Sequence, residues 1–307
     1  MGYLVLLLVF AISCFFAEPK QAIAKDSDIP TGDWRTVPIA DVHWHIYRPF
    51  RKTSGMDADE EYSKLKKLNV RWAGGVGDGP NKRLIELMGP RYISSYGQYE
   101  WTDVFRYGGD SALVSESNFT DFFKEAEELF KSGAISGLGE IHTNSAGINH
   151  RNTPIDGPVV QSMYQLVAKY NGWIQIHHSA NRAPFNDVIA VVKKHPKTTF
   201  VFSHCMYDRG AEKMRRLFQE TQNAFCELSA TGPLASGPGT PGRGNMLYTD
   251  TGLTPQWKSL INDFPDRVMI GSDNCCDLHN RYEELIGGLR KFVLQDLGFP
   301  HFSGHIW

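Results

Sequence analysis

The chain of 307 residues contains 41% hydrophobic and 21% charged residues, which is typical of a globular protein and excludes a collagen, a coiled coil or a wholly disordered chain. Its 32 basic and 34 acidic residues give a formal net charge of −2, so no excess of positive charge predicts binding to nucleic acid or to an anionic membrane. The mean hydropathy of −0.33 excludes a protein with many membrane-spanning helices. The eleven histidines need an explanation, because histidine is the commonest metal ligand.

Residues 1–24 are predicted to be a cleaved export signal that precedes a single domain of residues 25–307. The run from Tyr3 to Ala17 is apolar and uncharged, and Ala22-Ile23-Ala24 matches the small-residue pattern of a cleavage site. Two alternatives stay open, a lipoprotein signal that ends at Cys14 and an uncleaved anchor. The sequence therefore predicts an exported protein, periplasmic or secreted, which contacts a membrane only through its N-terminus, with lipid anchoring as the alternative.

Short apolar runs of strand type alternate with helical patterns along the rest of the chain. The predicted strands span residues 38–43, 70–76, 92–99, 134–141, 173–177, 198–204, 224–229 and 267–272. The predicted helices span residues 57–68, 81–88, 118–132, 158–170, 184–195, 209–221, 255–264 and 279–294. The clearest of them is the third, where Phe119, Phe122, Ala126 and Phe130 share one helical face and Gly133 follows the end.

This strict alternation predicts an α/β protein with a parallel sheet and with helices outside it. Eight strand–helix units predict a (β/α)8 TIM barrel, in which active sites lie at the C-terminal ends of the strands. A doubly wound open sheet is the alternative, but it would need a glycine-rich turn after the first strand, where the sequence has His43-Trp44-His45. The segment 231–252 is rich in Gly, Pro, Ser and Thr and predicts either a lid over the substrate or a mobile loop.

Four cysteines remain after removal of the predicted signal, namely Cys205, Cys226, Cys275 and Cys276. Four are too few for a disulfide framework in a chain that is long enough to bury an adequate core. The sequence does not decide whether any pair is oxidised.

Side chains of the metal-binding type end five of the eight predicted strands. They are His43 and His45 on the first strand, Glu140 on the fourth, His177 or His178 on the fifth, His204 on the sixth and Asp273 on the eighth. The two histidines of the first strand are two residues apart and so point to the same side, about 6.5–7 Å apart. Because a barrel gathers these strand ends at one mouth, the sequence predicts a bound metal ion there. Surface or packing roles are assigned to His142, His195 and His301, and to His178 if His177 is the ligand.

At these strand ends the sequence resembles the amidohydrolase superfamily, specifically its amidohydrolase-related branch of metal-dependent hydrolases. The resemblance runs from Ile39 to about Arg290, in the motifs A-D-V-H-W-H, G-L-G-E-I-H, I-Q-I-H-H-S, F-V-F-S-H-C, F-C-E-L-S and D-R-V-M-I-G-S-D. The residues from Leu297 to Trp307 do not match the family's terminal helical segment, so the C-terminal tail is predicted to be atypical or truncated.

The resemblance implies a role for each strand-end residue. It implies that His43, His45, His177 and Asp273 bind metal and that Asp273 also shuttles a proton, and it favours His177 over His178 as the ligand. His204 matches a histidine that either binds a second metal ion or polarises the substrate. Glu140 is similar to the bridging glutamate of the TatD-like nuclease branch.

These residues together predict a hydrolase in which metal-activated water attacks an ester, lactone or amide of a small molecule and Asp273 accepts the proton. The nitrogen and oxygen ligands favour Zn²⁺, with Mn²⁺ or Ni²⁺ as alternatives. One ion is expected, and two if Glu140 and His204 both bind. A decarboxylase of aromatic acids at the same site is the alternative function, and a non-catalytic metal-binding barrel is a third. No nucleic-acid partner is expected, and self-association is left open.

Overall fold

A computed structural model describes residues 33–46, 56–101, 119–144, 153–178, 184–233, 246–275 and 280–297. The predicted export signal (1–24), Cys276, residues 234–245 of the predicted loop and the tail 298–307 lie outside these ranges. The chain divides into residues 1–30 and 31–307, and the description below concerns the second unit. None of the helices within the described ranges has the length and apolar character that a membrane span requires.

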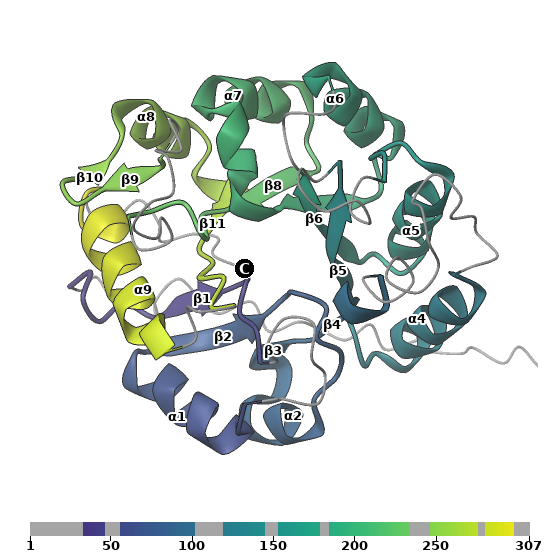
Figure 1. Ribbon diagram of the computed structural model, residues 1–307, viewed down its shortest axis with the longest axis horizontal. Coiled ribbons are helices and arrows are strands. Elements are labelled where there is room, and N and C mark those ends of the chain that lie inside the picture. Colours follow the sequence, from purple (N-terminus) through teal and green to yellow (C-terminus); the bar gives the residue numbers. More distant parts are fainter. Residues whose placement is uncertain are drawn as a thin grey trace, which may run out of the picture. The chain divides into compact units, whose positions relative to one another are not determined.

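Parallel strands form the centre of this unit (Figure 1). One sheet has the order β1-β2-β3, and the other has the order β11-β8-β7-β6-β5-β4. The strands of these sheets are β1 (Ile39–Asp41), β2 (Val70–Gly74), β3 (Tyr92–Ile93), β4 (Ser95–Gly97), β5 (Gly137–Thr143), β6 (Trp173–His178), β7 (Thr199–Phe202), β8 (Ala224–Glu227) and β11 (Val268–Met269).

The two sheets join into a closed ring. The strands β3 and β4 follow one another with only Ser94 between them, and the Ser94 carbonyl oxygen accepts a hydrogen bond from the backbone of Ser136, just before β5. At the other junction Val42 N donates to Ile270 O over 3.0 Å, which links the ends of β1 and β11. With β3 and β4 taken as one strand, eight parallel strands close the ring, so the prediction of a (β/α)8 barrel is confirmed.

Helices surround the ring and alternate with its strands (Figure 1). They are α1 (Ala58–Lys67), α2 (Lys82–Met88), α4 (Thr120–Ser132), α5 (Pro158–Lys169), α6 (Phe185–Lys194), α7 (Ala211–Glu220), α8 (Pro255–Asp263) and α9 (Tyr282–Leu289), with the short helices η2 (Gly89–Arg91), η7 (Ser203–Arg209), η8 (Pro265–Arg267) and η10 (Arg290–Leu294). Among the described residues, each of the eight longer helices overlaps a predicted one, with ends that differ by at most five residues.

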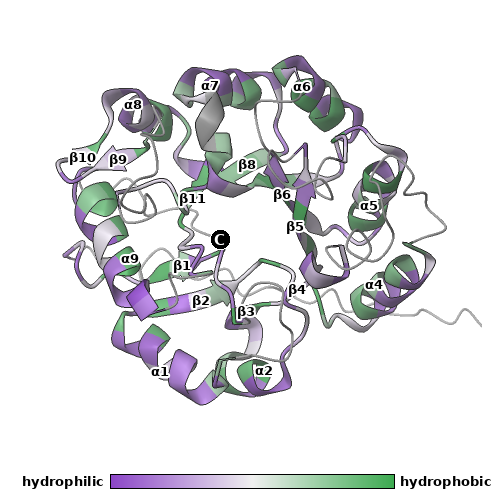
Figure 2. Ribbon diagram, viewed as in Figure 1, coloured by the Kyte–Doolittle hydropathy of each residue, from purple (hydrophilic) through white to green (hydrophobic). Residues whose placement is uncertain are grey.

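The helix ends follow the expected local chemistry. The side chain of Asn81 accepts a hydrogen bond from Leu84 N and so caps α2, and Gly133 ends α4 in the left-handed conformation. The helices carry both hydrophobic and hydrophilic residues (Figure 2), and on α4 the apolar Phe122, Ala126 and Phe130 are buried. Burial of such a stripe against the strands is what holds each helix to the barrel.

The strand and the helix of the last barrel unit, β11 and α9, both lie within the described residues, whereas the tail that follows is outside them. The Tyr282 hydroxyl at the start of α9 donates to Asp41 Oδ2 over 2.9 Å, which ties this helix to β1. The buried Arg290 donates to the carbonyl oxygens of Val37 (2.7 Å) and Leu68 (2.8 Å), which lie just before β1 and β2. The last helical segment is therefore anchored to the start of the chain's first two strands.

Two features were not predicted from the sequence. The strands β9 (Tyr248–Thr249) and β10 (Gly252–Leu253) form a short antiparallel pair at the end of the segment 231–252, for which a lid or a mobile loop is predicted. A disulfide joins Cys205, which follows β7, to Cys226, which lies in β8. The sequence alone did not decide whether these two cysteines are oxidised.

Gly77 marks a tight backbone crossing near the strand ends. It has a φ of +82°, and a Cβ there would lie 1.3 Å from the carbonyl oxygen of Gly139. Gly79 has a φ of +83° but would meet nothing within 4 Å. We expect Gly79→Ala to cost about 1–2 kcal/mol of unfolding free energy, from backbone strain alone. Gly77→Ala should cost more than about 4 kcal/mol or prevent folding, because strain and a backbone clash combine.

Urea unfolding of the two variants measures this difference, and Gly79→Ala serves as the matched control. Equal losses of unfolding free energy in the two variants would mean that the crossing at Gly77 is not as close as described.

Candidate metal centre

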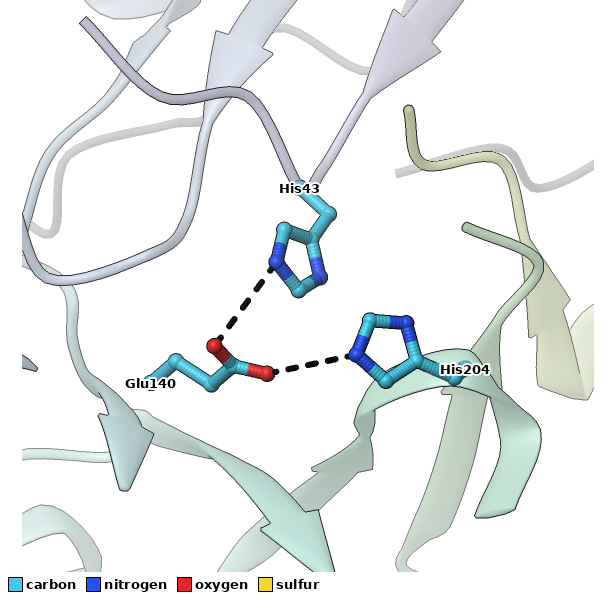
Figure 3. Close-up of side chains that lie close together, drawn as sticks. All are labelled: His43, Glu140 and His204. Atoms are coloured by element: carbon cyan, nitrogen blue, oxygen red, sulfur yellow. Dashed lines mark ion pairs between the residues drawn. The ribbon is translucent and has the colours of Figure 1, made fainter. Parts of the chain in front are cut away.

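The side chains predicted to bind metal lie together at the C-terminal ends of the barrel strands. They are His43 and His45 after β1, Glu140 on β5, His177 on β6, His204 after β7 and Asp273 after β11. Figure 3 shows His43, Glu140 and His204 pointing toward one another from three separate elements. Residues up to 230 positions apart in the sequence thus share one site, as the barrel prediction requires.

One group of ligand atoms joins β1 to the end of β11. Oδ1 of Asp273 lies 3.4 Å from Nε2 of His43 and 3.4 Å from Nε2 of His45. Backbone hydrogen bonds hold the two segments in register, because Asp273 N donates to His43 O over 2.8 Å. Asn274 binds the backbone of His45 on both sides, accepting from its N–H (2.6 Å) and donating to its carbonyl (3.1 Å).

A second group lies on the neighbouring strands β5 and β6. Glu140 Oε1 is 3.0 Å from His177 Nδ1, and Glu140 Oε2 is 3.5 Å from His142 Nε2. The rings of His142 and His177 stack with centroids 4.4 Å apart. His178 lies elsewhere, because its Nδ1 is 2.9 Å from the Thr143 hydroxyl. The site therefore takes in His142, to which the sequence assigned only a surface or packing role.

His204 lies between these two groups. Its Nε2 is 3.6 Å from Glu140 Oε1 (Figure 3). The same nitrogen is 3.3 Å from His177 Nδ1 and 3.9 Å from Asp273 Oδ2. The side chain reaches this position because His204 has a φ of +59°, in a left-handed turn directly after β7. Ser229 accepts from Nδ1 through both its hydroxyl (2.8 Å) and its carbonyl (3.2 Å), which leaves Nε2 facing the site.

Glu227 is a buried carboxylate behind the site that sequence analysis passed over, although it lies in the F-C-E-L-S motif. Its Oε1 accepts from Nδ1 of His43 over 2.8 Å and from the backbone N–H of His204 over 2.8 Å. Its Oε2 accepts from the backbone of Ser229 over 2.7 Å. Because Nδ1 of His43 donates to a carboxylate, Nε2, which lies 3.4 Å from Asp273 Oδ1, is the nitrogen that is left to bind a metal ion when the ring is neutral. One carboxylate thus fixes the tautomer of His43 and the place of His204.

The charges of the site favour a cation at its centre. Burial alone would lower the pKa of His43, but the carboxylates of Glu227, Asp273 and Glu140 raise it well above its ordinary value. Burial also opposes protonation of His45, yet Asp273 and Asp78 raise its pKa to about 9. Conversely, burial would raise the pKa of Asp273, and the charge of His43 holds it well below the ordinary range. A protein without metal would therefore hold protons where a metal ion would supply positive charge.

The donor set fits a divalent cation. Zinc–nitrogen and zinc–oxygen bonds of about 2.0–2.2 Å place tetrahedral ligands roughly 3.3 Å apart. The separations within the two groups are close to that spacing: 3.4 Å from Asp273 Oδ1 to each histidine, and 3.0 and 3.5 Å from the two oxygens of Glu140 to His177 and His142. Nε2 of His43 is buried and makes no hydrogen bond to any residue that the structure describes, which is costly unless another partner binds it.

Replacing Glu227 by glutamine tests its positioning role. The neutral amide is a weaker acceptor for His43 Nδ1, so we expect metal affinity to fall about 10–100-fold, as for other partners of metal-binding histidines. Titration against a competing chelator measures the affinity. Glu61, a buried glutamate on α1 that pairs with Lys64 at 2.8 Å, supplies the control, because Glu61→Gln should leave metal affinity unchanged. An unchanged affinity in Glu227→Gln would show that the contact to His43 is dispensable.

Comparison with solved structures finds proteins of low sequence identity. An amidohydrolase from Burkholderia multivorans with bound HEPES has a TM-score of 0.49 at 13% identity, and the match covers 88% of this chain and 96% of that one. A probable 2-pyrone-4,6-dicarboxylic acid hydrolase from Acinetobacter baumannii with bound citric acid has a TM-score of 0.43 at 14% identity, covering 83% and 92%. An uncharacterized TIM-barrel protein from Bordetella bronchiseptica has a TM-score of 0.44 at 12% identity, covering 75% of both chains.

Sequence comparison gives the family directly. No curated protein matches the chain at a significant level. The family model described as amidohydrolase, however, matches residues 99–307, which is about two thirds of the chain. The matched part contains Glu140, His177, His204 and Asp273, so it includes all the strand-end residues of the site beyond the first strand. The protein belongs to the amidohydrolase family.

Proposed function

We propose that this protein is a metal-dependent hydrolase that cleaves an ester, lactone or amide of a small molecule. The proposal is carried by the proximity of ligand atoms from the first and last strands. Oδ1 of Asp273 lies 3.4 Å from Nε2 of both His43 and His45. Three more side chains of the metal-binding type lie beside them, namely Glu140, His177 and His204. In this proposal His43, His45, Glu140, His177 and Asp273 are metal ligands, and His204 either binds a metal ion or contacts the substrate. The donor set favours Zn²⁺.

A bound divalent cation would supply acidified water and would polarise the carbonyl of the substrate. The residues of the chain then move the proton. The low pKa of Asp273 keeps it ionised, so its carboxylate accepts the proton of the attacking water and returns it to the leaving group. Burial and the nearby His177 lower the pKa of His204, so this ring is neutral and holds Nε2 toward the reacting atoms.

The exposure of the side chains indicates where the substrate enters. The side chains of His43 and His45 are 0% and 1% exposed, whereas those of Asp273 and His177 are 15% and 23% exposed. The two histidines that follow β1 therefore form the closed floor of the site. The substrate approaches over Asp273 and His177, which places the proton acceptor on the open side.

The raised pKa values predict that metal affinity increases with pH. Metal binds neutral imidazole, while in the metal-free protein His45, with a pKa of about 9, is protonated at neutral pH. For each proton that the metal must displace, the apparent metal affinity falls about tenfold when the pH is lowered by one unit. We expect Co²⁺ or Zn²⁺ affinity to fall at least tenfold from pH 8 to pH 7 and again to pH 6.

Titrations at these three pH values measure the slope. The variant Asp78→Asn removes a carboxylate that raises the pKa of His45, so its slope should be shallower. An affinity independent of pH in the natural protein would contradict the description of the site's charge.

A substrate panel tests the reaction itself. Protein loaded with one metal at a time is assayed for cleavage of lactones, esters and amides and, separately, for CO₂ release from aromatic acids. Cleavage that depends on the metal and is abolished in Asp273→Asn is the expected result. Release of CO₂ without hydrolysis would replace the proposal by the decarboxylase alternative. Bound metal without any turnover would favour a non-catalytic barrel.

We also propose that the protein is exported after cleavage between residues 24 and 25. The apolar run and the Ala22-Ile23-Ala24 pattern support this proposal. A mature mass that begins at Lys25 would agree with it, and a lipidated Cys14 would contradict it.

A further inference from the structure

The disulfide between Cys205 and Cys226 lies directly beside two residues of the metal centre. Cys205 follows His204 in the chain, and Cys226 precedes Glu227. Both cysteines are 0% exposed, and their Cα atoms are 4.7 Å apart. The backbone N–H of His204 also donates to Oε1 of Glu227 over 2.8 Å. The ends of β7 and β8 are thus joined twice, by a covalent bond and by a hydrogen bond.

The backbone that follows β7 is strained at this point. His204, Cys205 and Met206 have φ values of +59°, +45° and +45°, in the left-handed region that residues other than glycine seldom occupy. Each such residue costs conformational free energy, so consecutive ones persist only where the surrounding structure holds them. In this conformation His204 Nδ1 donates to the Ser229 hydroxyl over 2.8 Å, and Nε2 faces the site. The disulfide is attached to the middle residue of the three.

We propose that the Cys205–Cys226 disulfide is a clamp that keeps His204 directed at the site, so that catalytic activity depends on its oxidation state. The inference rests on the proposed function, in which His204 binds a metal ion or contacts the substrate. Opening of the bond frees the strained turn from its covalent connection to β8, and the turn relaxes toward ordinary backbone conformations. His204 Nε2 then leaves its position 3.6 Å from Glu140 Oε1.

The burial of the clamp determines when it can open. Because Cys205 and Cys226 are fully buried, a reductant should not reach their sulfurs in the folded barrel, and reduction should require a denaturant. A phosphine then breaks the S–S bond: phosphorus is oxidised to the phosphine oxide with the oxygen of a water molecule, and the two sulfurs take up its two protons as thiols. Disulfides form and persist in oxidising compartments, which agrees with the export proposed above.

Amide hydrogen exchange tests the clamp without any assay of activity. Full-length natural protein is compared with Cys205→Ala/Cys226→Ala and with natural protein that is reduced by a phosphine in urea and refolded. The His204 amide should exchange about 10–100-fold faster in both, because a cross-link over a loop of this size restrains its ends by a comparable factor. The amide of Phe200, which donates to Asn223 O over 2.8 Å on the same strand, should stay as protected as in the natural protein.

A double-mutant cycle tests whether the clamp acts through His204. On the substrate that the panel identifies, loss of the disulfide should lower kcat/KM about 100-fold, the usual effect of misplacing a group of an active site by about 1 Å. His204→Ala should lower kcat/KM at least as far. Loss of the disulfide in the His204→Ala protein should lower it no further, because the side chain that the clamp positions is already absent.

Two controls exclude other causes. Ala126 is buried on α4, which packs against β4, and glycine there lowers helix stability without touching the turn. Ala126→Gly should keep the natural ratio of the His204 and Phe200 exchange rates and an unchanged kcat/KM. Phosphine treatment should leave Cys205→Ala/Cys226→Ala unaffected, which excludes an effect of the reductant at Cys275 or on the metal.

The outcomes separate this inference from the proposed function. Equal acceleration of exchange at His204 and Phe200 would show that the disulfide only stabilises the barrel, and would overturn the clamp. An equal loss of kcat/KM in the natural and His204→Ala proteins, when the disulfide is removed, would overturn it too. Faster exchange at His204 alone, in a protein that cleaves nothing on the panel, would support the clamp and overturn the proposed hydrolase.

Discussion

His43→Ala should lose both the bound metal and the catalytic activity. Alanine removes Nε2, the buried candidate ligand atom 3.4 Å from Asp273. It also removes Nδ1, which donates to Glu227 over 2.8 Å. Because the cation supplies several kcal/mol of transition-state stabilisation, we expect kcat/KM to fall about 10³-fold or more on the substrate that the panel identifies. Elemental analysis and steady-state kinetics of the same preparation measure the two losses.

The thermal transition of the metal-free variant provides the control for folding. The barrel is held by its strands and by the buried stripes of its helices, so the variant should still unfold cooperatively. Full metal content together with normal activity in His43→Ala would show that the first-strand histidines do not bind the catalytic ion.

Asp273→Asn should separate metal binding from proton transfer. The asparagine side chain has the size of aspartate and keeps one oxygen beside His43 and His45. This amide oxygen can still bind the metal ion, but more weakly than a carboxylate oxygen. The amide cannot accept the proton that the carboxylate accepts. We expect kcat to fall about 10²–10⁴-fold, the usual contribution of general acid–base catalysis, with a smaller loss of metal content.

The pH profile of kcat distinguishes this role from a purely structural one. Because the pKa of Asp273 lies well below its ordinary value, its ionisation should give a limb of the profile at low pH, and this limb should disappear in Asp273→Asn. Asp41 supplies the control, because it is a strand-end carboxylate that belongs to none of the ligand groups. Its side chain accepts hydrogen bonds from Ser272 N (2.9 Å) and from the Tyr282 hydroxyl (2.9 Å). Asp41→Asn should lower stability and leave the pH profile unchanged. A natural profile in Asp273→Asn would assign the proton transfer to another group.

The strand and helix order could be predicted from the sequence because each element carries a strong local signal. The apolar stripe on α4 and the side-chain cap at Asn81 are examples, and both are present in the structure. The barrel then follows from eight repeats of one unit, and it brings His43 and Asp273 together without any knowledge of side-chain contacts. The positions of the candidate ligands could thus be predicted because each one ends a strand.

The supporting residues could not be predicted because their roles depend on contacts between distant strands. Glu227 carries no local mark of its bond to His43, 184 positions away in the sequence. His142 could have been noticed from its spacing to Glu140, since residues two apart share a strand face. Its proximity to His177 depends on the register of β5 with β6, which the sequence does not reveal. The pairing of Cys205 with Cys226 depends likewise on the neighbouring positions of β7 and β8.

Anomalous diffraction from crystals of the Zn²⁺-loaded protein, recorded on both sides of the zinc absorption edge, tests the central claim most directly. The account predicts an anomalous peak about 2.0–2.2 Å from His43 Nε2, His45 Nε2 and a carboxylate oxygen of Asp273. A fully loaded crystal with no peak among these three side chains, or with its zinc bound only at another part of the protein, would contradict it.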